Sequence, residues 1–371
     1  MKVTFINRMM GILRGGGEHV DVNLARELQK LGAQARFVVG RRILRLDEPL
    51  DEFDTHYITT PYLRSISYPL DGSSFHPFRS IGSRVRCLDD YLFVNAAFRY
   101  LNNDYDTDVY QICTLPVLGA RLARTGRKTV IHWPGPPGRQ AIEYAKRCSA
   151  VFAHGKSYEH AKAFIPQTQY IPAGCDIDLF KPLPQRDATE GKCRFLFVGR
   201  CIPVKNLEFL IDGFVEAKRR RPGISLCIVG DGALLPKLKA RASGYNLGDS
   251  INFPGTQTGE SLVTQYQKAD CFTLLSHYES FGIVVLEAMS SGLPVILSNV
   301  GYLPTFINSY QAGTLIEPGN VSELAEAMIW WVDNPSERIA TGLRNRCTAE
   351  KNFSWTSSAK KLLLLYESLL P

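Results

Sequence analysis

The chain has 371 residues, of which 45% are hydrophobic and 21% are charged, and its formal net charge is +7. This length exceeds the size at which one hydrophobic core keeps growing, so we expect two domains. The nine cysteines contain no CxxC pair, which favours reduced thiols in a cytoplasmic protein over a disulfide framework or a zinc site. We expect no signal peptide, because Arg8 interrupts the opening apolar stretch, and no run approaches the roughly 20 apolar residues that cross a bilayer.

Short β-branched and aromatic runs alternate with helical patterns along almost the whole chain. Most of these runs are continuously apolar, which is typical of strands buried on both faces of a parallel sheet. Two successive series of strands and helices predict two doubly wound α/β domains. The predicted strands are 2–7, 35–40, 55–60, 108–115, 128–133, 150–155 and 168–172, followed by 194–199, 225–230, 250–255, 270–275, 294–298 and 313–317.

The domain boundary is expected in the polar, proline-bearing segment 181–192, because a fresh strand follows it. We therefore predict a first domain over 1–180 and a second over 181–352. Residues 353–371 read as a capped terminal helix with a rich apolar face. Residues 61–86 are poor in periodicity and rich in Ser, Pro and Arg, so we predict a long functional loop there.

Three consecutive glycines follow the first strand, in the sequence RGGGEHV that ends at Val20. Gly16 and Gly17 would let the backbone approach a phosphate or a sugar closely. The spacing is not GxGxxG, so the dinucleotide fingerprint is absent. A flexible turn between strand and helix is the alternative interpretation.

Two cations follow one predicted strand, and a histidine lies at the end of another. Arg200 and Lys205 lie in VGRCIPVKN, just after strand 194–199. Ligands of open α/β sheets bind at the carboxyl ends of strands, and arginine can bond two phosphate oxygens at once. The pair is therefore a candidate to neutralise a diphosphate. His132 ends strand 128–133, where it could contact a sugar hydroxyl or a phosphate, or be structural.

The segment ESFGIVVLE places Glu279 and Glu287 on either side of a predicted loop-to-helix junction. Gly282 allows a ligand close to the backbone, and the amides of Phe281 and Ile283 would belong to a helix start that attracts phosphate. A phosphate-binding helix start with a carboxylate at each end suits a nucleotide sugar. An amphipathic helix with two solvated glutamates is the alternative.

Other charged patterns are less specific. The aspartate pairs DTD (106–108) and DID (176–178) have no supporting ligands nearby, so we expect no metal site. The basic clusters at 36–45, 79–86 and 218–221 could hold an anionic membrane surface or an anionic acceptor, or could be solvated faces. No recognition motif accompanies them, so nucleic acid is not an expected partner.

In this order, the motifs resemble the retaining glycosyltransferases of family four, the group 1 glycosyl transferases. The resemblance implies the GT-B architecture, in which two Rossmann-like domains face each other across a cleft and the terminal helix packs back on the first domain. The first domain would bind the acceptor and the second the nucleotide sugar. The motifs are the glycine loop, IPAGCD, GR…KN, VGDG, ESFGIVVLEAMSSGLPVI, GTLIEPGN and the closing FSW…Y.

The resemblance also assigns roles by position. Glu279 would bond the donor sugar's hydroxyl groups and Glu287 the ribose hydroxyl groups. The amides of Phe281, Gly282 and Ile283 would hold the sugar and the pyrophosphate. Arg200 and Lys205 would neutralise the departing diphosphate, which Gly16 and Gly17 would approach from the facing domain. His132 would contact the donor sugar.

The expected enzyme is a metal-independent, cofactor-free hexosyl- or glycosyltransferase of the cytoplasm or its membrane face, using a UDP-sugar or, next, a GDP-sugar. Its acceptor could be a sugar, a lipid-linked group or a small molecule. A sugar-nucleotide epimerase, a phosphorylase of the same fold and a non-catalytic nucleotide-sugar binding protein remain open. An NADP-dependent oxidoreductase is a further alternative, because Gly40, Arg41 and Arg42 follow the second strand.

Overall fold

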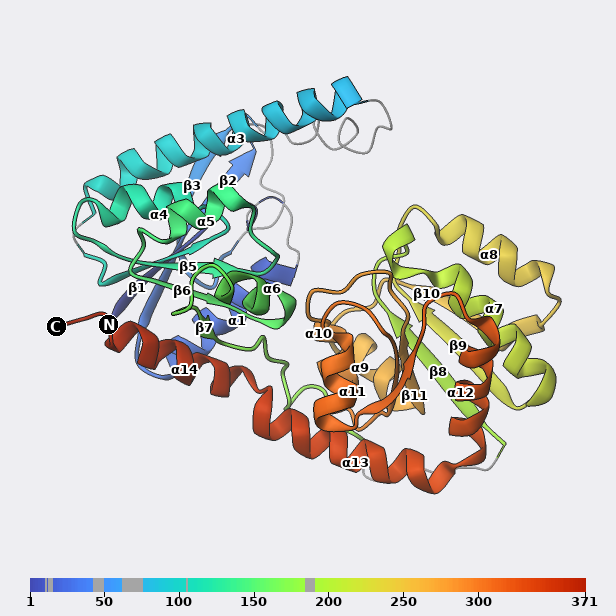
Figure 1. The fold of residues 1–371 in the computed structure, drawn as a ribbon. Helices are drawn as coiled ribbons and strands as arrows, with labels where there is room; N and C mark the ends of the chain where they lie inside the picture. Colours follow the sequence, from blue (N-terminus) through green and yellow to red (C-terminus); the bar gives the residue numbers. More distant parts are fainter. Residues whose placement is uncertain (11, 13–15, 43–49, 62–75, 105, 184–190) are drawn as a thin grey trace. The chain divides into compact units, whose positions relative to one another are not determined.

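The computed structural model describes residues 1–10, 12, 16–42, 50–61, 76–104, 106–183 and 191–371. They form two compact units, each of which contains both helices and strands (Figure 1). The first unit consists of Met1–Pro172 together with Trp355–Pro371, and the second of Ala173–Ser354.

The division between the units falls before residue 173 instead of at the expected 180/181. Residues 173–180 belong to the second unit because its helices hold them. Arg346 donates from Nη1 to the carbonyl oxygens of Ile177 and Phe180, at 2.8 and 2.9 Å. Ser290 Oγ donates to the same Phe180 oxygen at 2.8 Å.

The first unit is built on a seven-stranded parallel sheet in the order β3-β2-β1-β4-β5-β6-β7. Its central strands are buried along their length, as their apolar runs predict. The strands are β1 (Lys2–Asn7), β2 (Gln34–Arg42), β3 (Asp54–Thr60), β4 (Val109–Cys113), β5 (Lys128–Trp133), β6 (Ala150–Ala153) and β7 (Gln169–Tyr170).

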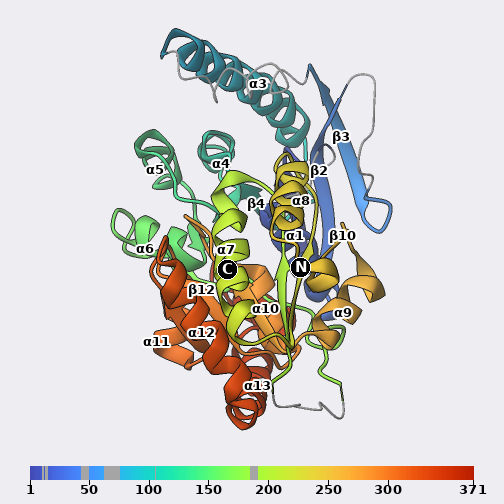
Figure 2. The same ribbon diagram turned by 90° about the vertical axis from the view of Figure 1, so that its right-hand side faces the viewer.

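Helices cover this sheet in two groups. The helices α3, α4 and α5 pack on one another, and α14 packs beside α1 on the other side of the sheet (Figure 1). The turned view of Figure 2 shows α3 running beside α4 and β3. The helices are α1 (Gly16–Lys30), α3 (His76–Asn102), α4 (Pro116–Ala123), α5 (Arg139–Ala145), α6 (Gly155–Lys162) and α14 (Trp355–Glu367).

The predicted loop over 61–86 is wrong for its second part. The helix α3 begins at His76, so residues 76–86 are helical. Pro77 stands in the first turn of this helix, where the absent N–H costs nothing and the fixed φ favours helix. Residues 62–75 lie outside the described part of the chain.

The second unit is built on a six-stranded parallel sheet in the order β10-β9-β8-β11-β12-β13. The two-domain α/β fold predicted from the sequence is therefore confirmed. The strands are β8 (Cys193–Val198), β9 (Ile224–Val229), β10 (Ile251–Gly255), β11 (Cys271–Leu274), β12 (Val295–Ser298) and β13 (Gly313–Ile316).

Seven α-helices and two short 3₁₀ helices of the second unit connect or flank these strands within the residues that the structure describes. They are η1 (Pro203–Lys205), α7 (Leu207–Arg220), α8 (Leu235–Gly244), η2 (Gly248–Ser250), α9 (Gly259–Lys268), α10 (Ile283–Ser290), α11 (Leu303–Tyr310), α12 (Val321–Asp333) and α13 (Pro335–Asn352).

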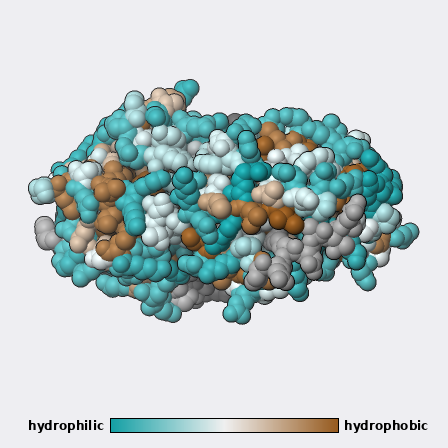
Figure 3. Space-filling model, turned by 90° about the horizontal axis from the view of Figure 1, so that it is seen from below, coloured by the Kyte–Doolittle hydropathy of each residue, from teal (hydrophilic) through white to brown (hydrophobic). Residues whose placement is uncertain are grey.

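The face of the molecule in Figure 3 is mainly hydrophilic where it is coloured. Figure 3 shows one face on which hydrophobic residues form separate patches between hydrophilic ones. Over the described ranges, no helix combines the length and the apolar character that a membrane crossing requires.

Candidate functional site

The first candidate site lies in the second unit, where the loops after β8 and β11 meet. These strands are parallel neighbours, so their carboxyl ends share one edge of the sheet. The backbone N–H of His277 donates to the carbonyl oxygen of Val204 at 2.8 Å and joins the two loops. Ligands of open α/β sheets bind at this kind of edge.

The joined loops bring Lys205 and Glu279 together. Lys205 Nζ lies 2.6 Å from Glu279 Oε2, and each side chain is 17% exposed. Lys205 ends η1, and Glu279 lies in the loop between β11 and α10. The structure thus places a predicted diphosphate-binding cation against a predicted sugar-binding carboxylate, in a position that solvent can reach.

Gly282 forms the start of α10. Its φ is +93° and it caps the helix without a side-chain hydrogen bond. A side chain here would be strained by the backbone conformation and would lie 3.2 Å from Leu303 and 3.4 Å from Glu279. The N–H groups of Ile283 and Val284 have no hydrogen-bond partner among the residues described. These amides and the helix dipole make the start of α10 attractive to an anion.

The side chain of Phe281 anchors the loop that precedes α10. It is buried, and its ring centroid lies 5.1 Å from that of Tyr302 and 5.9 Å from that of Phe306. The predicted role of this residue concerns its amide, which the anchored ring would hold in a fixed position.

Glu287 lies one turn further into α10 and is half-buried. Tyr266 of α9 donates its hydroxyl hydrogen to Glu287 Oε2 at 2.7 Å. Burial raises the pKa of Glu287 to about 7, against the opposing effect of the Tyr266 hydrogen bond. The carboxyl group can therefore change its charge near neutral pH.

Arg200 follows β8 and is exposed, and its guanidinium group has no ion pair or hydrogen bond to any described residue. Its loop is tied to the loop after β9, since the N–H of Cys201 donates to the carbonyl oxygen of Asp231 at 2.8 Å. The structure records no contact between Arg200 and the pair of Lys205 and Glu279. Its guanidinium group is open to a ligand.

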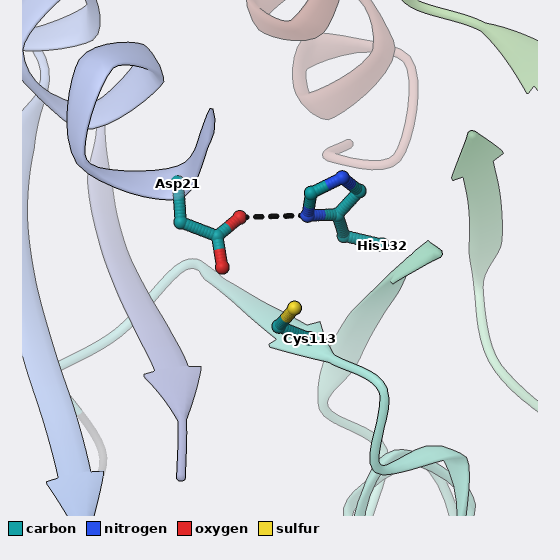
Figure 4. Close-up of side chains that lie close together, drawn as sticks. All are labelled: Asp21, Cys113 and His132. Carbon is teal, nitrogen blue, oxygen red and sulfur yellow. Dashed lines mark hydrogen bonds and ion pairs between the residues drawn. The ribbon is translucent and has the colours of Figure 1, made fainter. Parts of the chain in front are cut away.

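A second group of polar residues is buried in the first unit, around His132 at the end of β5 (Figure 4). His132 Nδ1 lies 2.8 Å from Asp21 Oδ1. The same carboxylate accepts hydrogen bonds from Gln111 Nε2 at 2.8 Å and from Asn7 Nδ2 at 2.9 Å. Tyr366 of α14 donates its hydroxyl hydrogen to Gln111 Oε1. A chain of hydrogen bonds therefore runs from the terminal helix to the histidine.

This network orients the imidazole. The ring of His132 stacks on Phe152, with centroids 4.6 Å apart. With Nδ1 bonded to a carboxylate, Nε2 is the atom left for another partner, and it is buried without one in the described structure. His154 lies beside the ring, and burial lowers its pKa to about 3, so that it stays neutral.

Cys113 completes a cluster that could be considered for a metal. Ligand atoms of Asp21, Cys113 and His132 lie within 4.8 Å of one another. Burial raises the pKa of the Cys113 thiol well above its usual value, so the thiol is protonated in the structure as it stands. The Asp21 carboxylate already accepts three hydrogen bonds. The chemistry fits a hydrogen-bonded network better than a metal centre.

The two predicted glycines at the start of α1 differ. Gly17 is buried, and a side chain there would lie 2.8 Å from the ring of Pro134. This glycine is explained by packing against Pro134. Gly16 is exposed, and a side chain there would meet nothing within 4 Å. Arg14 and Gly15 lie outside the described residues, and contact of this loop with a phosphate stays a prediction.

Sequence reasoning missed several residues. Tyr266, Asp21, Gln111 and Tyr366 were not predicted as site residues. One signal was available, because Gln111 interrupts the apolar run of β4 with a buried amide.

Gly40 is also explained by packing, since a side chain there would lie 2.3 Å from the carbonyl oxygen of Arg8. This close approach favours a structural role over a dinucleotide site.

Known proteins resemble the second unit in sequence and the chain in fold. Residues 183–350 match the family model of the glycosyl transferases group 1. The chain is 33% identical over 218 residues to the D-inositol 3-phosphate glycosyltransferase of Corynebacterium jeikeium, covering 54% of this chain and 52% of that protein. It is 28% identical over 219 residues to a GDP-mannose-dependent alpha-(1-6)-phosphatidylinositol monomannoside mannosyltransferase of Mycobacterium tuberculosis, covering 54% of this chain and 57% of that protein.

The chain spans about half the length of these curated relatives. A solved structure, Anabaena HepE in complex with UDP, matches 99% of this chain and 100% of its own with a TM-score of 0.77 at 19% identity. That similarity concerns the fold. The second unit therefore belongs to the glycosyl transferases group 1 family, and the chain has the GT-B fold that the sequence predicted.

Proposed function

We propose that this protein is a retaining glycosyltransferase in the biosynthesis of a glycan, glycolipid or other glycoconjugate. It moves a sugar from a nucleoside-diphosphate sugar to an acceptor hydroxyl. The observation that carries the proposal is the start of α10, where open amides lie between Glu279, paired with Lys205, and Glu287, bonded to Tyr266. A diphosphate suits the amides, and hydroxyl groups suit the two carboxylates.

The donor's sugar would bond to Glu279 and its ribose to Glu287, while the amides of residues 281–283 hold the pyrophosphate. We favour UDP as the nucleotide and GDP next. The family match supports a nucleotide-sugar donor. The name of one relative includes GDP-mannose, and a protein of the same fold was solved with UDP, so both nucleotides are worth testing.

The difficult step is the growth of negative charge on the departing diphosphate. Arg200, Lys205 and the start of α10 supply positive charge and need no metal for this task. A preorganised donor of this kind typically contributes on the order of 10²–10³ to the rate. In a retaining reaction without a protein nucleophile, the acceptor attacks from the face that the diphosphate leaves, and the leaving phosphate takes the acceptor proton. His132 Nε2, a buried atom in need of a partner, would bond a hydroxyl of the donor sugar.

Calorimetric titration with UDP, GDP, ADP and NADPH tests the binding step. We expect one nucleoside diphosphate to bind and Glu287→Ala to weaken it about tenfold or more, because hydrogen bonds to charged groups are worth about 1.5–3 kcal/mol. Glu260→Ala removes an exposed glutamate of α9 and is the matched control. Binding of NADPH alone would overturn the proposal in favour of redox chemistry.

Proton NMR of the slow hydrolysis of UDP-glucose or GDP-mannose tests the chemical step without a known acceptor. A retaining transferase releases the sugar first as the α-anomer of the donor. Initial release of the β-anomer would contradict retention. Conversion to another nucleotide sugar would indicate an epimerase, and binding without any turnover, with acceptor alcohols included, would indicate a non-catalytic binding protein.

A further inference from the structure

We infer that the pocket between α3, α4 and α5 of the first unit binds the acceptor, and that it takes a neutral, flat, apolar group such as the ring of an aromatic alcohol. The inference rests on the proposed function and names the substrate class that the function leaves open. The pocket has a volume of about 390 Å³. Its wall is mainly carbon, from Tyr91, Val94, Leu115, Val117, Ala141 and Tyr144.

The size and lining of the pocket suit a small molecule. Ligand pockets in proteins range over about 300–1,000 Å³ and are mostly apolar with a few polar groups. At the lower end of that range, one or two fused rings fit, and a folded peptide segment does not. The tyrosine rings of Tyr91 and Tyr144 offer flat apolar surfaces to such a group.

The charges around the pocket are balanced. Arg8 is buried between Asp89 and Asp90 and forms an ion pair with each of them. The guanidinium group of Arg121 donates to Asn95 and lies over the ring of Phe98, 4.1 Å from its centroid. The described lining itself contains one carboxylate, Asp90, and one cation, Arg121, so it carries no excess positive charge for a phosphate. This balance favours a neutral acceptor over a phosphorylated sugar.

Thr114 is one of the polar residues that line the pocket. It has a φ of +61°, a conformation that is strained for a β-branched residue. Strain of this kind persists where the surrounding structure enforces it and is common at functional sites. The N–H of Thr114 donates to the carbonyl oxygen of His132 at 3.2 Å. Thr114 directly follows β4, so this part of the pocket lies at the carboxyl edge of the sheet, where ligands of open α/β sheets bind.

Cys87 at the rim of the pocket provides a probe. Cys87 and Cys347 are the exposed cysteines among nine, and Cys347 lies in α13 of the second unit. Mass spectrometry would monitor the rate at which iodoacetamide alkylates both cysteines. The reaction is run in the presence of 2-naphthol, naringenin, glucose 6-phosphate or anionic phospholipid vesicles. At about ten times its dissociation constant, a pocket ligand slows alkylation of Cys87 about tenfold.

We expect 2-naphthol or naringenin to slow alkylation of Cys87 and to leave Cys347 unchanged. Val117→Asp places a charge on the apolar wall and should abolish this protection. Leu343→Asp makes the same kind of change at an exposed position outside the pocket and should not. Tyr91 is 63% exposed, so Tyr91→Ala provides a second variant with little risk to folding.

Three results would overturn the inference. Protection by glucose 6-phosphate alone would assign the pocket to a phosphorylated sugar, and protection by vesicles alone would assign this face to a membrane. Absence of protection by both aromatic alcohols would exclude the apolar class. The same samples are titrated with UDP. Loss of UDP binding would count against the proposed function, whereas loss of Cys87 protection with UDP binding intact would count against the pocket alone.

Discussion

The two groups of candidate site residues differ in how their polar atoms are partnered. In the second unit, Lys205 and Glu279 are partly exposed and the first amides of α10 are open. In the first unit, the side chains of Asp21 and His132 are 2% and 0% exposed, and Asp21 is fully engaged. A ligand can replace one partner of an ion pair that solvent reaches, whereas a buried hydrogen-bond network fixes the positions of its side chains. Substitutions in the first group should therefore lower turnover, and substitutions in the second group should lower stability as well.

The largest expected effect is on turnover in Lys205→Ala. Removing this cation should lower kcat on the order of 10²–10³-fold, since its charge would stabilise the departing diphosphate. Thermal unfolding should change less than turnover, because solvent reaches both side chains and can hydrate Glu279 once Lys205 is removed. Turnover is measured with the nucleotide sugar whose diphosphate binds in calorimetry.

The control for this variant is Lys237→Ala. Lys237 is 68% exposed and pairs with Glu208 on the surface of the same unit. Its removal should leave turnover unchanged. A kcat of Lys205→Ala within a factor of about three of the wild type would rule out the proposed charge stabilisation, which requires on the order of 10² or more.

The next largest effect is on stability in Asp21→Ala. The change leaves buried donors of His132, Gln111 and Asn7 without an acceptor. Each unsatisfied group costs about 1–3 kcal/mol, so we expect a loss of about 3 kcal/mol or more in the first unit and a thermal midpoint lower by roughly 10 °C. Calorimetry on the full chain would resolve this transition.

Asp51→Ala removes an exposed aspartate of the same unit and should leave the midpoint unchanged. If both variants unfolded at the wild-type temperature, the buried network would contribute nothing to stability, and the contrast between the two groups would disappear.

The contrast also explains what could be predicted from the sequence. Each predicted strand exists, and the central ones could be predicted because a strand buried on both faces is written as a continuous apolar run. Glu279 and Lys205 could be expected at one site, since they follow parallel strands. The start of α3 was missed, because residues 76–86 lack apolar periodicity while Pro77 permits a helix.

The buried network could not be predicted in the same way. Asp21 and His132 are 111 positions apart, and Gln111 and Tyr366 are 255 apart. No local pattern records such contacts, which arise only when α1 and α14 pack on the sheet. The amide of Gln111 within an apolar strand indicated a buried polar group and left its partners unspecified.

A pH effect should further distinguish the site of the second unit from the buried network of the first unit. The pKa of Glu287 is raised to about 7, so the folded protein binds the proton more tightly than the unfolded chain. Its contribution to stability is therefore fully present below the unfolded pKa of about 4.5 and is lost as pH rises through about 7. If the ionised form accepts the ribose hydrogen bonds, affinity for UDP-glucose should rise about tenfold between about pH 6 and pH 8.

Glu287→Gln removes the titration and should give a flat affinity profile over the same range. UDP-glucose is the better probe because its phosphates do not titrate there. A profile that kept its slope in Glu287→Gln would assign the titration to another group.

The smallest effect is expected for Tyr366→Phe, which tests whether the terminal helix contributes to the network. The change removes one hydroxyl donor and leaves Gln111 Oε1 buried without that partner. We expect the free energy of unfolding to fall by about 1 kcal/mol and the thermal midpoint by roughly 2–4 °C, because the aromatic ring at position 366 stays packed. Tyr100→Phe is the matched control, since it removes a more exposed hydroxyl of the first unit and keeps the ring stacked on His56. Equal midpoints for the two variants would confine the network to the sheet and α1, and α14 would then act through apolar packing alone.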